Sequence, residues 1–198
     1  MRGIEQIPWL YEIICSLYER AGLAEWRQAL VAGSRGRVLD IGSGTGRNLP
    51  LVPDGTAVIG LDPSLDALRR ARRRAPRALL VVARAEALPF RDGVFDTVLS
   101  GLVFCSVDDP QGGLAEVRRV LRTQGRLRML EHVRSSVPWR ARLQDLIQPA
   151  WTRAAGGCRP NRDTEAAVER AGFRIEADGR RARGNNRLFS ARAGGSSR

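Results

Sequence analysis

The chain has 198 residues, of which 43% are hydrophobic, and this size and composition suit one domain with a complete core. No apolar run reaches the roughly 18 residues of a membrane-spanning helix, and the N-terminus lacks a secretory signal pattern, so we expect a cytoplasmic protein. The net charge is +12, and all 33 lysine-or-arginine positions are arginine, which suggests biased codon supply as much as a binding face. We expect at most weak peripheral contact with an anionic membrane, no nucleic acid partner and no obligate protein partner.

Residues 1–35 are predicted to form a helical cap that packs on the rest of the chain. Apolar side chains recur at helical spacing in this segment, at Ile7, Leu10, Ile14, Leu17 and Tyr18. The spacing leaves three roles open: a cover for the sheet, a lid over an acceptor pocket, or a contact with a membrane surface.

Strand and helix patterns alternate from residue 36 to residue 193, which predicts one α/β domain. The strand candidates are residues 38–40, 57–61, 78–82, 95–100, 126–131, 173–177 and 188–192. Helical patterns occupy residues 64–74, 111–122, 138–151 and 162–172. The short apolar strands indicate a Rossmann-like, doubly wound, mostly parallel sheet of seven strands that is buried on both faces and closed by a C-terminal hairpin. Residues 194–198 are predicted to form a disordered tail.

A glycine-rich turn follows the first predicted strand in the sequence "RVLDIGSGTGRNLP". Gly42, Gly44 and Gly46 predict a tight turn, followed by a short helix that begins near Thr45 and lets a ligand approach the backbone. The dinucleotide pattern G-x-G-x-x-G fails here, because its third glycine is replaced by Arg47.

Two aspartates beside this turn indicate the kind of ligand. A carboxylate at Asp40 would repel a pyrophosphate, but it would attract a cationic group. Asp62 ends the second predicted strand, where a doubly wound sheet places the acid that binds a ribose. S-adenosylmethionine has a ribose, an ammonium group and a positive sulfonium, and it therefore fits both carboxylates.

Four successive motifs of the chain resemble those of the class I S-adenosylmethionine-dependent methyltransferases, and more closely those of the quinone and phospholipid methyltransferase group. The motifs are "VLDIGSGTG", "GLDPS", "AEALPFRDGVFDTVLS" and "EVRRVLRTQGRLRMLEHV". The segments "LVFCSV" and "QPAWTRAAGGCRPNRDT" are similar to methyltransferase-like proteins that methylate alkyl thiols and to bacterial relatives described as phosphatidylethanolamine methyltransferases.

The resemblance implies a set of cofactor-binding residues. The methionine end of S-adenosylmethionine would be surrounded by Asp40, Gly42, Gly44 and Asn48. The ribose would be held by Asp62, and the adenine would lie near Pro63, Ala85 and Glu86. The backbone of Ser100 and Gly101 would pass beneath the sulfonium. Many relatives have an aspartate where this chain has Arg84, so the adenine amino group needs another acceptor.

His132, the only histidine, follows the fifth predicted strand at the edge where open α/β sheets bind ligands, and we predict it as the catalytic base, with a structural role as the alternative. Loops at the same edge supply the predicted acceptor residues Cys105, Cys158, Asn161 and Arg162. Cys105 is also typical of a small buried apolar side chain. The cysteines lie far apart in the sequence and offer no zinc spacing, so no metal is expected.

The sequence therefore predicts an S-adenosylmethionine-dependent methyltransferase that acts on a small, largely apolar acceptor. A thiol ranks first as the acceptor. Phosphatidylethanolamine nitrogen and a quinone carbon are the alternatives, and a cofactor-binding scaffold without catalysis is the alternative from another class. Trp139 and Trp151 could line an acceptor pocket or pack in the core.

Overall fold

The computed structural model describes residues 22–154 and 157–194. Its helices are α2 (Ala24–Val31), the 3-10 turn η3 (Leu49–Leu51), α3 (Leu65–Arg74), α4 (Pro110–Val120), α5 (Pro138–Ala154) and α6 (Thr164–Arg170). Its strands are β1 (Arg37–Ile41), β2 (Ala57–Asp62), β3 (Leu79–Val82), β4 (Phe95–Gly101), β5 (Leu121–His132), β6 (Phe173–Ile175), β7 (Arg181–Arg183) and β8 (Asn186–Ala193). The predicted apolar stripe from Ile7 to Tyr18 and tail residues 195–198 lie outside the described residues, whereas Gly194 donates a backbone hydrogen bond to Gly172.

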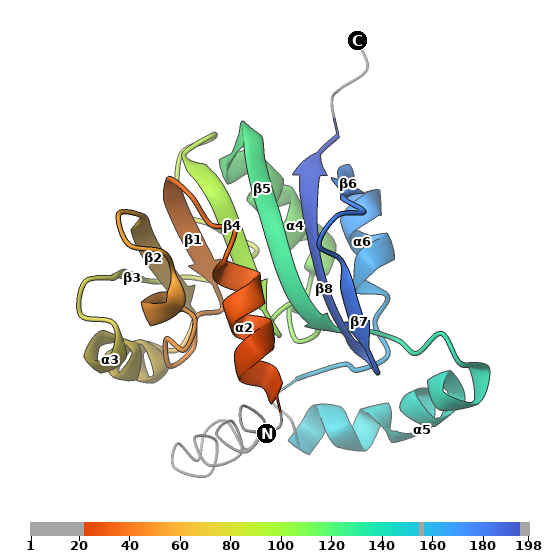
Figure 1. The fold of residues 1–198 in the computed structure, drawn as a ribbon. Helices are drawn as coiled ribbons and strands as arrows, with labels where there is room; N and C mark the ends of the chain where they lie inside the picture. Colours follow the sequence, from red (N-terminus) through yellow and green to blue (C-terminus); the bar gives the residue numbers. More distant parts are fainter. Residues whose placement is uncertain (1–21, 155–156, 195–198) are drawn as a thin grey trace.

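All strands join one sheet in the order β3-β2-β1-β4-β5-β8-β6, with β7 paired to β8 (Figure 1). Strands β1 to β5 pair in parallel, and β8 runs antiparallel to β5, β6 and β7. The predicted mostly parallel sheet with an antiparallel C-terminal closure is confirmed. The seven predicted strands are present, and β7 adds a short eighth strand beside the turn at Gly184.

Two predicted boundaries are wrong. The helix expected to begin near Thr45 is a turn, and a helical segment starts only at Leu49. Gly42, Gly44 and Gly46 have φ angles of +61°, +52° and +80°, which a right-handed helix does not accommodate. Further along, the helix predicted for residues 111–122 ends at Val120, because Leu121 already pairs with Phe95 as the start of β5.

Helices cover both faces of the sheet. Side chains alternate along each strand, so Leu39 and Ile41 of β1 pack in the core beneath α4 and α6, whereas Val38 packs with Leu30 of α2 on the other face. A smaller cluster around Leu49 and Ala71 joins η3 and α3 to the same face as α2. The molecule is therefore a three-layer sandwich with the sheet in the middle.

Burial on both faces holds for the centre of the sheet but is wrong at its edge. The side chains of β1 from Val38 to Ile41 are buried, as are most of those of β4. On β3, which has a neighbour only at β2, Leu79 and Val82 are 64% and 54% exposed. Apolar composition alone did not distinguish an edge strand from a central one.

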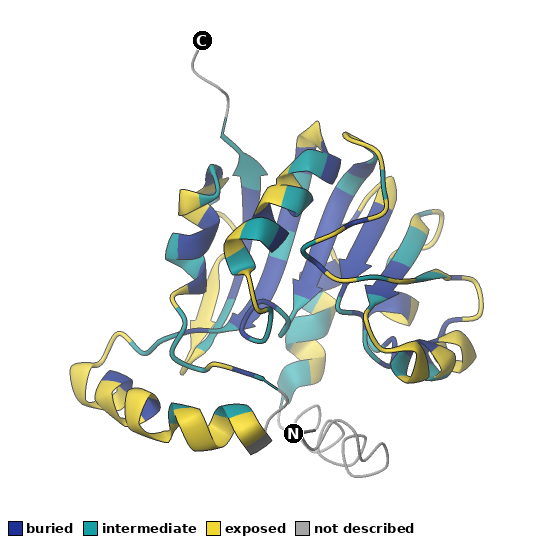
Figure 2. Cartoon of the chain, turned by 180° about the vertical axis from the view of Figure 1, so that it is seen from behind, coloured by how far each residue is buried: buried dark blue, intermediate teal, exposed yellow. Residues whose placement is uncertain are grey.

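Helix α5 lies beyond the lower end of the sheet, apart from the two helical layers, and most of its surface is exposed (Figure 2). Apart from residues 1–21, 155–156 and 195–198, the chain contains no helix that is both long enough and apolar enough to cross a membrane.

Candidate cofactor and acceptor site

The predicted site residues meet at the carboxyl edge of the sheet. Strands β1, β2 and β4 are adjacent and parallel, and Asp40 on β1 is in register with Gly60 on β2 and Leu99 on β4. The loops that leave these strands therefore begin side by side. This is the edge at which open α/β sheets bind ligands.

Asp40 is fully buried, and only one of its oxygens has a partner. Its Oδ1 accepts a hydrogen bond of 3.0 Å from Asn48 Nδ2, whereas the buried Oδ2 has no partner among the described residues. Desolvation raises the pKa of Asp40 to about 7, although the hydrogen bond from Asn48 and the charge of Arg27 oppose the shift. An orphaned buried carboxylate oxygen is a costly arrangement that a cationic ligand would relieve.

Arg27 was not predicted from the sequence, although it contributes to this site. Its Nη1 on α2 donates to Asn48 Oδ1 at 2.8 Å, so that α2, the glycine turn and β1 are joined in one chain of hydrogen bonds. One arginine among 33 basic residues carries no local signal in the sequence. Only the packing of α2 on the sheet brings it to the site.

Asp62 closes the other side of the glycine turn. Its Oδ2 accepts from the backbone N–H of Gly44 at 2.9 Å, and its Oδ1 accepts from that of Ser64 at 2.8 Å. Burial raises the pKa of this carboxyl group, and the two backbone donors oppose the rise. Each carboxylate oxygen has a second lone pair, so both ribose hydroxyls can still be bound.

The three glycines of the turn are required for different reasons. A Cβ on Gly42 would lie 2.4 Å from Val103, and a Cβ on Gly46 would lie 2.8 Å from Ala71. A Cβ on Gly44 would meet nothing closer than the Gly42 carbonyl at 3.9 Å. Gly42 and Gly46 therefore permit close packing within the protein, whereas Gly44 leaves open space beside Asp62. This space and the orphaned Asp40 oxygen fit a cofactor with a ribose and a cationic end.

Near the residues predicted to contact the adenine, Glu86 offers a hydrogen-bond acceptor in place of the aspartate that many relatives have at the position of Arg84. Arg84 is exposed and pairs with Asp108 at 2.8 Å, so its guanidinium is engaged at the surface. Glu86 is half-buried, its Oε2 lies 3.6 Å from Arg84 Nε, and its Oε1 accepts a long hydrogen bond of 3.5 Å from Asp109 N. Each of these oxygens has a second lone pair, which leaves Glu86 acceptor capacity for the adenine amino group. Ala85 is buried beside Glu86, whereas Pro63 is exposed.

Glu131 organises the loop after β4, and sequence reasoning did not give it this role. It is fully buried and accepts from Ser100 Oγ at 2.8 Å and from the backbone N–H groups that follow, those of Val103, Phe104 and Cys105. Burial raises the pKa of Glu131, and these donors oppose the rise. Ser100 and the loop from Val103 to Cys105 are thus held by this carboxylate, and no hydrogen bond or ion pair joins it to His132 in the described part of the chain. The sequence signal that could have indicated this role is an acidic residue at the end of an apolar strand, before the histidine in "MLEHV".

The structure brings Cys105, His132 and Cys158 together, although they are far apart in the sequence. Their potential ligand atoms all lie within 4.8 Å of one another, and the two Sγ atoms are 3.6 Å apart. This proximity corrects the expectation that their spacing offers no metal site. The hydrogen bond that joins the Cys158 and Cys105 thiols, assisted by His132 and Trp151, lowers the pKa of Cys158. The same thiol pair, together with burial, raises the pKa of Cys105.

The remaining predicted acceptor residues surround this group and do not all point into it. Arg162 donates from Nη1 to the Phe104 carbonyl at 2.6 Å and to the Val107 carbonyl at 2.5 Å, and so braces the loop that carries Cys105. Asn161 donates to Asp145 of α5 at 2.9 Å. Trp151 reaches Cys158, whereas Trp139 is 62% exposed and stacks with Arg140.

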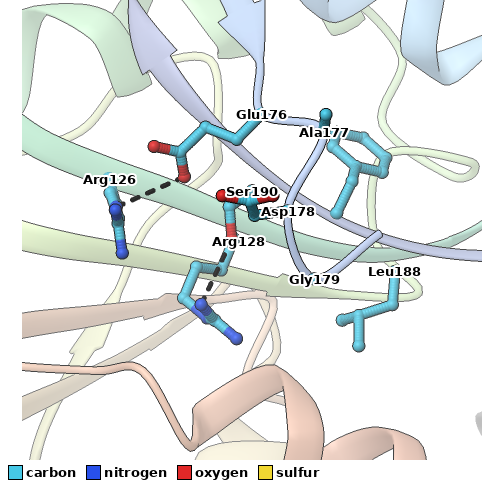
Figure 3. Close-up of a pocket in the computed structure, with 9 residues that line it drawn as sticks. Arg126, Arg128, Glu176, Ala177, Asp178, Gly179, Leu188 and Ser190 are labelled. Atoms are coloured by element: carbon cyan, nitrogen blue, oxygen red, sulfur yellow. Dashed lines mark hydrogen bonds and ion pairs between the residues drawn. The ribbon is translucent and has the colours of Figure 1, made fainter. Parts of the chain in front are cut away.

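A separate hollow of about 260 Å³ opens where β5 and β8 face the loop after β6 (Figure 3). Within it, Arg126 pairs with Glu176 at 3.3 Å and Arg128 Nη1 donates to Ser190 Oγ at 3.1 Å. The residues that line this hollow come from outside the carboxyl edge and include none of Asp40, Asp62, Cys105 and Cys158. We therefore place the candidate site at the carboxyl edge.

Residues 39–129 match a family model described as a methyltransferase domain. This segment of the chain is a methyltransferase domain. The chain is 36% identical over 153 residues to human thiol S-methyltransferase TMT1B, a match that covers 72% of this chain and 63% of that protein. It is 38% identical to the demethylmenaquinone methyltransferase of Beutenbergia cavernae, over 58% of this chain and 49% of the relative. It is 36% identical to the phosphatidylethanolamine N-methyltransferase of Cereibacter sphaeroides, over 49% of this chain and 51% of the relative.

The chain spans less than two thirds of the length of these curated relatives. Two solved structures share the methyltransferase domain's fold. One is described as an S-adenosylmethionine-dependent methyltransferase and possible histamine N-methyltransferase from Thermotoga maritima, with a TM-score of 0.67, 22% identity and coverage of 92% of this chain and 98% of that one. The other is a methyltransferase from Mesorhizobium loti, with a TM-score of 0.67, 22% identity and coverage of 87% and 99%.

Proposed function

We propose that this protein transfers a methyl group from S-adenosylmethionine to the thiol sulfur of a small, largely apolar acceptor. The observation that carries the proposal is the group of Cys105, His132 and Cys158 at the carboxyl edge, next to the loop that leaves β4. Surroundings that lower the pKa of Cys158 favour a sulfur anion. The same surroundings would favour the thiolate of an acceptor, which is the nucleophilic form.

The bound cofactor supplies a methyl group already activated by the positive sulfonium. The chain's own residues therefore have to orient the two molecules and control the acceptor's proton. Asp62 would hold the ribose and Asp40 the cationic end of this cofactor, and the loop from Ser100 to Cys105 would lie beside the methyl group. Glu131 fixes this loop through four donors, and Arg162 braces it from the other side.

The similarity to thiol S-methyltransferase TMT1B supports the choice of sulfur, because that match covers more of this chain than the matches to the quinone and phospholipid enzymes. Three acceptors decide between the candidates: ethanethiol, dispersed phosphatidylethanolamine and a demethylated menaquinol. S-adenosylhomocysteine release is measured by mass spectrometry at equal enzyme concentration. We expect the thiol to be methylated fastest. A faster reaction with either other acceptor would reject the proposal, and tight cofactor binding without turnover would favour a scaffold.

Phospholipid N-methylation is the second candidate, because α5 presents an exposed apolar face. Trp139, Leu143, Ile147 and Trp151 recur at every fourth residue of this helix, Leu146 beside them is 78% exposed, and each of the others is more than 40% exposed. Exposed arginines flank the stripe at Arg140, Arg142 and Arg153. Such a helix suits the interface of an anionic bilayer. A second group of arginines, Arg69, Arg70, Arg72, Arg73 and Arg74, lies on α3, where no comparable exposed apolar face accompanies them.

Vesicle co-sedimentation tests this candidate. The protein is mixed with vesicles of phosphatidylcholine and phosphatidylglycerol at low and high salt, beside the variants Leu146→Asp on α5 and Leu79→Asp on the exposed edge of β3. A phospholipid methyltransferase would pellet even at high salt, would lose binding only in Leu146→Asp, and would methylate phosphatidylethanolamine faster than ethanethiol. For a thiol methyltransferase we expect association that salt abolishes, because attraction without insertion is weak.

A further inference from the structure

The thiols of Cys105 and Cys158 and the ring of His132 form a compact group that combines soft and borderline ligands. The two cysteines are 2% and 9% exposed, whereas His132 is half-buried, so the group reaches the surface on its histidine side. Two thiolates and one imidazole are a ligand set that Zn²⁺ takes in proteins.

The spacing of the ligand atoms matches a tetrahedral ion. Zn–S bonds of about 2.3 Å at tetrahedral angles place two sulfurs about 3.8 Å apart, and the Sγ atoms of Cys105 and Cys158 are 3.6 Å apart. No pair of the three ligand atoms exceeds 4.8 Å. Binding therefore needs shifts of about 1 Å or less, which side-chain rotation provides.

Each ligand is held in place by contacts that need no ion. Cys105 donates its backbone N–H to Glu131 at 3.3 Å and accepts from Arg159 N at 2.8 Å. The carbonyl of Cys158 accepts from Thr152 Oγ1 at 3.0 Å, and His132 ends β5 in register with Asn186 of β8. Ligands positioned by such surroundings lose little conformational freedom on binding.

We propose that Cys105, Cys158 and His132 bind one Zn²⁺ ion whose fourth coordination position takes the sulfur of the acceptor thiol. Three protein ligands leave one tetrahedral position open, as in catalytic zinc sites. Binding of the ion itself is independent of the proposed thiol methylation, but the role of the fourth position rests on it.

The charges favour this arrangement. Two thiolates and a neutral imidazole give a neutral complex with Zn²⁺, and a bound acceptor thiolate makes it singly negative. Arg162 lies close enough to interact electrostatically with both cysteines, so its positive charge would stabilise the anionic complex. Zn²⁺ would also deprotonate the acceptor thiol outright, which removes the need for a separate base.

The transfer step balances without another reactant. The acceptor thiol releases its proton to water as its sulfur binds the ion. A lone pair of that sulfur then forms the new S–CH₃ bond while the S–CH₃ bond of the cofactor breaks, and its electron pair stays on the cofactor sulfur. The products are the methyl thioether and S-adenosylhomocysteine.

Metal binding is measured directly on the full chain. The protein is stripped with a chelator under reducing conditions and titrated with Co²⁺, a spectroscopic substitute, and then with Zn²⁺. We expect one ion per chain, a tetrahedral cobalt spectrum with thiolate charge-transfer absorption, and its loss when Zn²⁺ is added. Ethanethiol should perturb the cobalt spectrum by entering the fourth position.

Variants assign the ligands. Since losing an outer-shell partner already weakens metal binding about 10- to 100-fold, Cys105→Ser and Cys158→Ser should each weaken it by at least about 100-fold. Cys15→Ser, which changes the third cysteine, is the matched control and should bind the ion normally. Circular dichroism checks that each variant folds, and the titration of the unmodified protein stands even where a variant does not fold.

The outcomes separate this proposal from the function above. A chain that binds no cobalt, that forms a Cys105–Cys158 disulfide instead, or whose cobalt spectrum survives Cys105→Ser overturns the metal site. Thiol methylation that continues unchanged in the stripped protein overturns the catalytic role of the ion and leaves thiol methylation standing. A normal cobalt spectrum without thiol methylation would reject the proposed function and keep the site.

Discussion

Asn48 donates a hydrogen bond of 3.0 Å to one oxygen of Asp40 and leaves the other oxygen of this buried carboxylate without a partner among the described residues. The arrangement is costly for folding, because burial disfavours the charged form. It is useful for binding, because a cationic ligand finds a desolvated negative charge that is already positioned. Removing the charge of Asp40 should therefore raise the stability of the fold and lower the affinity for the cationic ligand.

Asp40→Asn keeps the shape of the side chain and an acceptor for Asn48, and it removes the buried charge. The folded-state pKa of about 7 lies above the usual 3.8, so the unmodified protein loses stability as pH rises from about 4 through about 7. We expect the variant to melt at a higher temperature at pH 8, with a difference that shrinks as the pH falls toward 4. Differential scanning calorimetry across this range measures it, and lower stability at pH 8 would reject the interpretation.

The same variant should bind S-adenosylmethionine about ten- to hundredfold more weakly, since a hydrogen bond to a charged group contributes roughly 1.5–3 kcal/mol. In the unmodified protein, affinity should rise as Asp40 ionises through pH 7, with Arg27 favouring the charge and Asp62 opposing it. Isothermal titration calorimetry in buffers of different ionisation enthalpy would detect the released proton. Tight NAD binding by the unmodified protein would contradict the cofactor assignment.

Asp62→Ala should lower the affinity for S-adenosylmethionine by about ten- to hundredfold, because it removes the proposed acceptor for the ribose hydroxyls. It also removes the acceptor for the backbone of Gly44, which loosens the turn. Asp66→Ala is the matched control, since this exposed carboxylate pairs with Arg69 on the same helix and lies outside the glycine turn. Equal affinity in a folded Asp62 variant would remove this residue from the site.

Gly44→Ala and Gly93→Ala form a pair that separates strain from binding. Both glycines have positive φ, +52° and +62°, and a Cβ on either has no contact closer than 3.9 Å. Each alanine should therefore cost about 1–2 kcal/mol of stability from backbone strain alone. Only Gly44→Ala should lose cofactor affinity, because its methyl group enters the open space beside Asp62. Thermal melts and calorimetric titrations of the two variants test this, and equal affinities would show that the space holds no ligand.

The sequence allowed the sheet, the glycine turn and the two aspartates to be predicted, because each depends on local signals. Asp40 lies one residue before the end of β1 and Asp62 ends β2. Parallel strands bring such ends together whatever the detailed packing. The turn itself was predicted, but the start of the helix after it was not, because positive φ angles at Gly42, Gly44 and Gly46 delay helical structure to Leu49.

The acceptor side could not be predicted in the same way. Cys158 contacts Cys105, which lies 53 residues earlier in the chain, because the segment after α5 packs against the loop after β4. Arg162 of this segment donates a hydrogen bond to the Phe104 carbonyl of that loop. Arg27 reaches Asn48 only through the packing of α2. Contacts between segments so distant along the chain have no period or spacing in the sequence that would identify them.

His132 distinguishes the two ways in which the acceptor can lose its proton. The sequence predicted a base, and the structure places a ring nitrogen of His132 within 4.8 Å of both cysteine sulfurs. Under either role His132→Ala should lower turnover by about 10²-fold or more with ethanethiol, while the affinity for S-adenosylmethionine, measured by calorimetry, changes little. Unchanged turnover with a lower melting temperature would show a structural residue instead.

His132→Cys separates a base from a metal ligand. A thiolate can replace an imidazole in the coordination of Zn²⁺, whereas it cannot reproduce an imidazole base with a pKa near neutrality. If His132 is a ligand, the cysteine variant should bind cobalt with an extra thiolate charge-transfer contribution and retain more turnover than His132→Ala. If His132 is a base, the two variants should be equally slow, and turnover of the unmodified protein should be insensitive to chelators. Steady-state rates of the three proteins, with and without chelator, therefore decide which role His132 has.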